Sequence, residues 1–266
     1  DGIPNAPALT GEQQDLVKRC LQLDNVATGE FEEMNSKESH RIKYYKKKDI
    51  DANGKKSSKR ICIVKALAEI DLSAEEVLAW RWDWCSNEKM QFHKEDTKSI
   101  SRTVIKELGP NESILETTKA LPFPWKSRQF IIRALWTIAE DGSYLFCWEK
   151  FVEGSIPGIN PFSPRNSLRA DSRGFMRVTN LLETTRRSKF IVCQKINPLG
   201  NLPAWMSNIK LRHSLSTPVE LHSAFDNDKE IDFIAQAKLI HLMQNANGEV
   251  YGAEEVTLIE NTELKF

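Results

Sequence analysis

Short strand-like segments joined by tight turns fill the middle of the chain, and they limit the folds open to it. Each segment alternates apolar with polar residues or is rich in β-branched and aromatic residues. The segments cover residues 103–108, 113–121, 129–139, 144–152, 175–182 and 189–196. The pair Asp141–Gly142 predicts a hairpin turn between two of them. Because turns this short join antiparallel neighbours, we expect an antiparallel sheet.

Helical patterns lie outside this central series. Thr10 and Gln13 predict a capping box that starts a helix near the N-terminal end. Strand patterns between residues 41 and 72 flank an Asn53–Gly54 turn, and Ser73 then caps a short helix. Helices gathered at the two ends of the sequence, around an antiparallel sheet, indicate an α+β fold rather than alternating strands and helices.

The charges of the chain balance, because 37 lysines and arginines accompany 37 aspartates and glutamates in 266 residues. We therefore expect no nucleic-acid partner. The five cysteines are widely spaced and form no Cys-x-x-Cys pair, which predicts reduced thiols in a cytoplasmic protein rather than zinc ligands or disulfides. No apolar run is long enough to span a membrane.

Motifs that carry catalysis are missing from the chain. It has no glycine-rich phosphate loop, no GxSxG nucleophile elbow and no HExxH pair, and its five histidines are scattered. A catalytic cysteine with a distant histidine stays open, although nothing in the sequence selects one. We expect a binding domain that is not an enzyme and uses no metal or cofactor.

Residues 197–208 read as a strand end, a tight turn and the start of a helix. Pro203 falls in the first helical turn, where a missing amide proton costs nothing. No acidic residue follows before Glu220. The apolar side chains of this predicted helix are Trp205, Met206 and Ile209. A late apolar helix of this kind suits a lid over a hollow sheet that holds an apolar molecule.

The connection over residues 153–168 is long and contains several glycines and prolines. Its apolar residues Ile156, Ile159 and Phe162 are unusual for a plain surface loop. A gating lid and a packed surface loop are equally open interpretations.

A basic segment lies on both sides of the Asn53–Gly54 turn. Its lysines attract an anionic membrane surface in one interpretation. In the other, they keep an edge hairpin solvated. The residues concerned are Lys46, Lys47, Lys48, Lys55 and Lys56.

Seven tryptophans are many for this length, and most should lie in the core. Trp136 and Trp148 occupy the two strands joined by the Asp141–Gly142 turn. Both core and cavity positions stay open for them. Along the first of these strands, alternation places four side chains on one face, which we take as inward: Phe130, Ile132, Ala134 and Trp136.

Four local motifs, in order and at suitable spacing, resemble the START (steroidogenic-acute-regulatory-protein-related lipid transfer) family over residues 9–226. Residues 64–77 resemble its third strand and first short helix, with Asp83 near the end of that helix. Arg128-Gln129-Phe130 resembles its Arg-Asp-Phe, and Leu168-Arg169-Ala170 resembles its Val-Arg-Ala. Residues 200–208 resemble its Gly-x-Leu-Pro-x-Trp-Leu-x-Asn.

The resemblance implies a helix-grip fold, in which a curved antiparallel sheet of about nine strands surrounds a long C-terminal helix and encloses an apolar tunnel. It marks as motif residues Arg128, Arg169, Gly200, Pro203 and Asn208. The residues expected to contact a lipid are Glu116, Phe130, Ile132, Ala134, Trp136, Trp148, Trp205, Met206, Ile209 and His213.

The chain departs from the family pattern at several positions. Ala134 stands where sterol-binding and phosphatidylcholine-binding members carry a cavity-facing arginine, and Arg133 should face the opposite side of its strand. Glu116 is the nearest acidic residue on the preceding strand. Pro218 should kink or end the lid helix near Ser216, which divides the lid into two pieces.

We expect non-catalytic binding of one lipid or sterol, for transfer or for sensing. One alternative is a lipid-responsive regulatory module within a larger signalling protein. A second is a hydrolase-like or cyclase-like enzyme on the same fold. The expected domains are a START-like unit over residues 1–226 and a helical extension over residues 227–266, which includes an amphipathic stretch at 228–246 and leads into a longer host protein.

Overall fold

The structure is a computed structural model of the 266-residue chain. It divides into two compact units, Asp1–Phe225 and Asp226–Phe266. The described residues all belong to the first unit. They are residues 7–24, 31–34, 42–47, 62–87, 89–91, 99–159, 166–181, 186–200, 215 and 217–225. The predicted extension at 227–266 lies outside this set, as does the predicted lid helix from residue 202.

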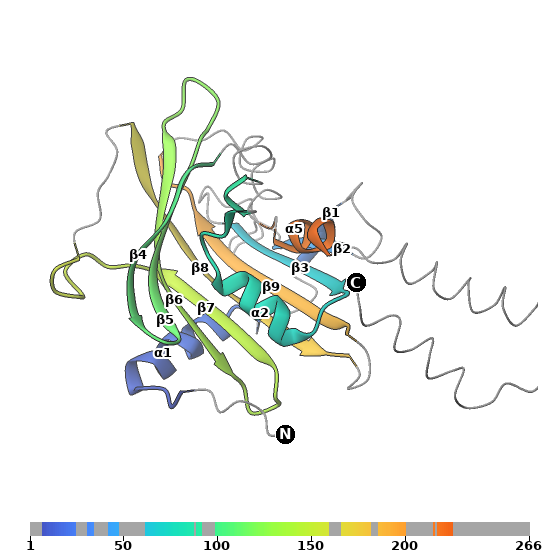
Figure 1. The fold of residues 1–266 in the computed structure, drawn as a ribbon. Helices are drawn as coiled ribbons and strands as arrows, with labels where there is room; N and C mark the ends of the chain where they lie inside the picture. The colour runs from blue at the N-terminus through green and yellow to red at the C-terminus, as the bar shows by residue number, and fades with distance from the viewer. Residues whose placement is uncertain are drawn as a thin grey trace, which may run out of the picture. The chain divides into compact units, whose positions relative to one another are not determined.

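Nine strands form one curved sheet (Figure 1). Their order across the sheet is β1-β2-β3-β9-β8-β7-β6-β5-β4, and each neighbour in this order pairs antiparallel. The strands are β1 (Phe31–Met34), β2 (Ile42–Lys47), β3 (Cys62–Ile70), β4 (Ser99–Gly109), β5 (Glu112–Lys119), β6 (Ser127–Ile138), β7 (Tyr144–Lys150), β8 (Ser167–Asn180) and β9 (Ser188–Asn197). The predicted antiparallel α+β architecture is confirmed.

Strand β8 begins at Ser167, eight residues before the predicted start at 175. The reason is a pairing that alternation cannot reveal: residues Ser167 to Ala170 run parallel to Ser127 to Phe130 at the start of β6. The shorter β7 ends at Lys150, so β6 and β8 meet directly beyond it. This places the predicted motif residues Arg128 and Arg169 in neighbouring strands.

Helix α1 (Gly11–Leu21) covers one face of the sheet, which we call the outer face. The capping box expected at Thr10 and Gln13 is present in both directions. Leu16 and Cys20 of α1 are fully buried against side chains of β6 to β9. Those partners are Leu135, Cys147, Phe175 and Cys193.

Helices α2 (Ala74–Trp82) and α5 (Thr217–Ala224) pack against the opposite face, which we call the inner face. Ser73 caps α2 through a second capping box, as the sequence predicts. Pro218 occupies the first turn of α5, where its missing N–H has no intrahelical partner to lose. A helix therefore begins beside Pro218. The predicted division of the lid into two pieces stays a prediction, because residues 201–214 and 216 lie outside the described set.

The described part of the long connection, residues 153–159, packs on the outer face. Ile159 is buried with Ile114, Ile131 and Phe151, and Ile156 packs beside them. These residues thus form a packed surface loop rather than a cover for the inner face. Residues 160–165 lie outside the described set.

Candidate functional site

The inner face of β6 and β7 presents one continuous apolar surface. Ile132, Ala134 and Trp148 are buried in a single cluster, and Phe130 and Trp136 pack against it. Ala134 pairs directly with Trp148 across the two strands. The structure therefore brings together all five described apolar residues that the sequence assigns to the site.

Trp148 is held in one orientation by its neighbours on β8. Its indole Nε1 donates a hydrogen bond to Ser172 Oγ at 2.9 Å. The ring lies over Gly174, where an added Cβ would sit 2.6 Å from the carbonyl oxygen of Cys193 and closer still to Trp148 Cζ2. Glycine is required here because no other residue leaves space for the ring.

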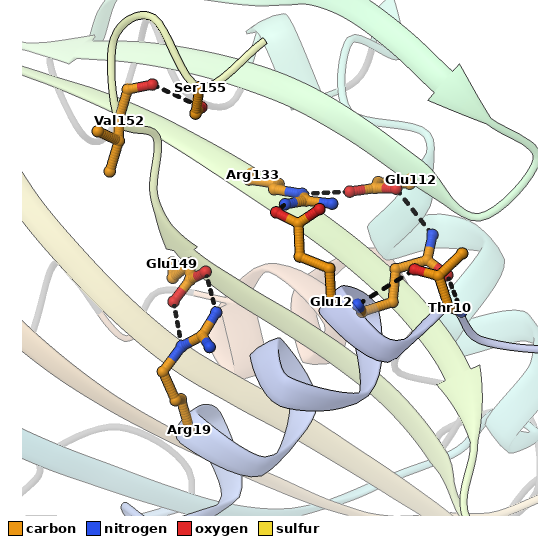
Figure 2. A network of polar contacts seen from close by, with 9 residues as sticks. Thr10, Glu12, Arg19, Glu112, Arg133, Glu149, Val152 and Ser155 are labelled. Carbon is orange, nitrogen blue, oxygen red and sulfur yellow. Dashed lines mark hydrogen bonds and ion pairs between the residues drawn. The ribbon is translucent and has the colours of Figure 1, made fainter.

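Arg133 points to the outer face, as the alternation along β6 predicts. It forms ion pairs with Glu112 on β5 and with Glu12 on α1, while α1 also contacts β7 through Arg19 and Glu149 (Figure 2). Position 134 itself adds no charged side chain to the inner face.

Glu116 does not belong to the inner face, so this assignment is corrected. It pairs with Ile131, an outer-face residue, in the β5–β6 register. Its carboxylate accepts hydrogen bonds from Ser101 Oγ at 3.0 Å and from Thr118 Oγ1 at 2.5 Å. The strand register decided the face, because paired antiparallel residues project to the same side.

Arg128 fixes the turn that follows β9. It is buried, and its guanidinium donates to the carbonyl oxygens of Pro198 at 2.6 Å and Leu199 at 3.1 Å. Burial lowers its pKa. At Gly200, φ is 70°, and an added Cβ would stand 3.3 Å from Nη2 of Arg128. This motif arginine thus positions the segment entering the predicted lid.

Arg169 pairs with Glu153 and lies beside Gln129 in the parallel β6–β8 contact. It ties β8 to the loop after β7 and has a structural role in the described part of the chain. The other motif and lid residues predicted for the site are outside the described residues. They are Pro203, Trp205, Met206, Asn208, Ile209 and His213.

The sequence analysis missed three cations on the inner face, of which Lys89 and Arg102 are buried and Arg81 is half-buried. We call Arg81, Lys89 and Arg102 the cation cluster. Arg81 lies in the last turn of α2, and its Cζ lies 4.5 Å from the ring centroid of Trp84 and 4.6 Å from that of Phe146. Cζ of Arg102, on β4, lies 3.8 Å from the same Trp84 ring. The sequence 80–84, in which an arginine stands among three tryptophans, was the available signal.

Lys89 completes the cluster on the side of Trp80. Its Nζ lies 4.2 Å from the Trp80 ring centroid and donates to the carbonyl oxygen of Asp83. Lys89 is 1 % exposed, which is rare for a lysine. Cation–π contacts stabilise such buried charges partly, because the ring face carries negative potential.

Burial dominates the electrostatics of this cluster. It lowers the pKa of Arg81 to about 9, of Arg102 to about 10 and of Lys89 to about 7. Repulsion among the cations lowers the pKa values of Arg81 and Lys89 further, while Glu220 on α5 raises all three. Both guanidinium groups remain charged at neutral pH, and Lys89 titrates there.

A pocket lies between the cluster and the apolar inner face. The cavity is small, about 30 Å³ in volume. Arg81 stands at its charged side. The other described residues that line it are Trp148, Met176, Phe190, Val192, Gln194, Leu215 and Thr217. Such a lining fits a molecule that is apolar along most of its length and charged at one end.

Three of the five cysteines, Cys20, Cys147 and Cys193, are buried, and none of the five forms a disulfide. A hydrogen bond with Cys20 together with burial raises the pKa of Cys147, and burial raises that of Cys193 to about 12. Within the described residues, no group of histidine, cysteine and carboxylate side chains is placed to hold a metal ion. No helix in that same set is long and apolar enough to cross a membrane.

A curved antiparallel sheet with helices packed into its inner face defines the helix-grip class of α+β folds. Solved structures make this assignment specific. Human STARD10 superposes with a TM-score of 0.59 at 16% identity, covering 90% of this chain and 88% of that chain. Human StAR-related lipid transfer protein 5 gives 0.58 at 13% identity, with 81% and 95% covered. The lipid transfer and protein localization domain of human StarD13 gives 0.54 at 14% identity, with 82% and 98% covered.

The chain therefore has the START fold. No protein-family model matches it, and no curated protein matches it by sequence. The likeness resides in the arrangement of the strands.

Proposed function

We propose that the inner face binds one lipid or sterol molecule without chemical conversion, for transfer or for sensing. The observation that carries the proposal is the continuous apolar surface of β6 and β7, which borders a small pocket lined by Arg81 and by apolar side chains. Similar structures named as lipid transfer proteins support it. Affinity would come from burial of apolar area at about 25 cal/mol per Å², less the cost of ordering the ligand.

The test is mass spectrometry of lipids that copurify with the chain, followed by uptake from vesicles. We expect a defined lipid at up to one molecule per chain. A folded, lipid-free protein that takes up nothing from phosphatidylcholine, sterol-containing or anionic vesicles would contradict the proposal.

We also propose that the domain is a binding module rather than an enzyme. Its inner-face ionisable groups include cations held against indole rings, and the buried thiols with raised pKa values lie on the outer face. This arrangement suits recognition of charge more than nucleophilic attack.

The lysines of the basic segment would bind the cytoplasmic surface of an anionic membrane, so that the domain associates with the membrane peripherally. Within the basic segment, Lys46 and Lys47 lie in β2, and Lys46 is 3.7 Å from Glu32. Lys48, Lys55 and Lys56 are outside the described residues. Flotation with anionic and with neutral vesicles tests the proposal, and equal binding to both would refute an electrostatic role.

The domain division also remains a proposal. A lipid-binding unit over residues 1–226 and a helical extension over 227–266 would suit a sensing module within a longer host. Limited proteolysis of the 266-residue chain checks it. Cleavage concentrated near residue 227 is expected, and equal cleavage throughout residues 1–226 would oppose it.

A further inference from the structure

We propose that the cation cluster binds the anionic headgroup of the lipid, so that the inner face selects amphiphiles whose headgroup carries a net negative charge. This inference rests on the proposed lipid binding and specifies the ligand class. It does not use the position occupied by Ala134, which carries no charge.

The first argument is charge balance. Among the described residues, the buried carboxylate that acts on all three cations is Glu220, which is 6 % exposed. Asp83 acts on Lys89 and Arg102 but is itself exposed. Within the described part of the chain, the three cations therefore outnumber the buried carboxylates that act on them. Because a buried charge is costly without a counter-charge, a ligand anion would stabilise this arrangement.

The second argument is the set of available hydrogen-bond donors. The guanidinium carbon of Arg81 lies over the rings of Trp84 and Phe146, and these rings accept no conventional hydrogen bond from its N–H groups. No described residue accepts a hydrogen bond or forms an ion pair with Arg81. The indole N–H of Trp80, beside Lys89, is also buried without an acceptor among these residues. Phosphate and carboxylate oxygens match such donors, particularly those of arginine.

The third argument is the shape and lining of the pocket. Arg81 lines the same pocket as Trp148, Met176 and Phe190. An anion against Arg81 would thus be continuous with a chain lying along apolar side chains. A free inorganic anion would use the charged side and leave the apolar wall without a partner, so the geometry favours an anionic lipid.

The experiment offers the full chain vesicles with equal amounts of dioleoyl-phosphatidylglycerol and dioleoyl-phosphatidylcholine, which differ only in the headgroup. After separation from the vesicles, bound lipid is identified by mass spectrometry. We expect phosphatidylglycerol to be enriched about tenfold over phosphatidylcholine, the range expected for charged hydrogen bonds. Uptake of both lipids in equal amounts would overturn this inference and leave lipid binding intact. Uptake of neither would overturn both.

Two variants assign any preference to the cluster. Arg81→Gln and Arg102→Gln should abolish the enrichment while uptake of phosphatidylcholine continues, which also shows that the variants fold. Lys18→Gln removes one positive charge from an exposed position on α1 and should keep the full enrichment. Enrichment that survives both arginine substitutions, or that is lost in Lys18→Gln, would refute the assignment.

Inorganic phosphate distinguishes a lipid headgroup from a free anion. Relative to chloride at equal ionic strength, phosphate alone should change the Tm of the lipid-free wild type and of Arg81→Gln by the same amount, because its general stabilising effect does not involve the cluster. A rise in Tm with phosphate that Arg81→Gln removes would show a free-anion site and overturn the assignment to a lipid headgroup.

Discussion

The two faces of the sheet surround a half-buried arginine with different partners. On the outer face, Arg133 pairs with the carboxylates of Glu112 and Glu12, which join β5, β6 and α1. On the inner face, Arg81 contacts the rings of Trp84 and Phe146. Two carboxylates thus neutralise the outer arginine within the protein. The inner arginine is held mainly against aromatic rings, and under the binding we propose a ligand anion would add the missing negative charge.

The largest expected effect concerns the outer arginine. Arg133→Met should lower the free energy of unfolding by about 3 kcal/mol, because Glu112 stays buried without its cation. Urea unfolding measures the loss. Arg19→Met, at the more exposed pair with Glu149, is the matched control and should cost less than about 1 kcal/mol. Equal losses in the two variants would contradict the importance of burial.

An added methyl group at Gly174, on the inner face, should lower the free energy of unfolding by a slightly smaller amount. Gly174→Ala should cost about 2 kcal/mol, because its Cβ would collide with Trp148 and with the backbone at Cys193. Gly109→Ala, where nothing lies within 4 Å of the added Cβ, should change stability by less than about 1 kcal/mol. Thermal unfolding of the two variants checks this, and a Gly174→Ala protein as stable as the wild type would show that Trp148 is free to shift.

Substitution of the inner arginine, Arg81, should change the free energy of unfolding in the opposite direction. In lipid-free protein, Arg81→Met should raise the free energy of unfolding by about 1 kcal/mol, because it replaces a desolvated charge by an apolar side chain of similar length. The same substitution at Arg133 destabilises, so the pair is a direct test of the comparison. A loss of more than about 1 kcal/mol for Arg81→Met would mean that the inner cations are as well compensated as the outer ones.

The smallest expected effect is a pH dependence of anionic lipid retention. The pKa of Lys89 is about 7, because burial and the charges of Arg81 and Arg102 lower it more than Asp83 and Glu220 raise it. Lys89 therefore gains a proton and a positive charge as the pH falls through this range. Retention of phosphatidylglycerol, whose charge is constant here, should therefore be up to about fivefold tighter at pH 6 than at pH 8. Lys89→Met should remove the dependence. A steeper dependence in that variant would assign the titration to another group.

Local patterns anticipated most of the fold. The capping boxes at Thr10 and Ser73 both formed, because they depend only on residues three apart. Alternation along β6 placed Ile132 and Ala134 on one face and Arg133 on the other. The start of β8 escaped prediction, because its parallel contact with β6 joins segments about forty residues apart.

The sequence predicted the apolar part of the candidate site but not its charged part. The apolar wall followed from alternation, but Glu116 was placed on the wrong face because its side depends on the β5–β6 register. The cation cluster was missed altogether. Its members lie on α2, beyond α2 and on β4, and separation in sequence hides their common contact with Trp80 and Trp84.

By itself, the sequence determined the strands, the caps and the apolar side of β6, since these follow from spacing and from side chains within a few residues. Only the tertiary structure decided which charges share the inner face. Bringing Arg81, Lys89 and Arg102 together around two indole rings requires the sheet to curl and α2 to pack inside it. Burial then changes the chemistry of these groups, because low dielectric surroundings make surplus charge costly and an anionic partner favourable.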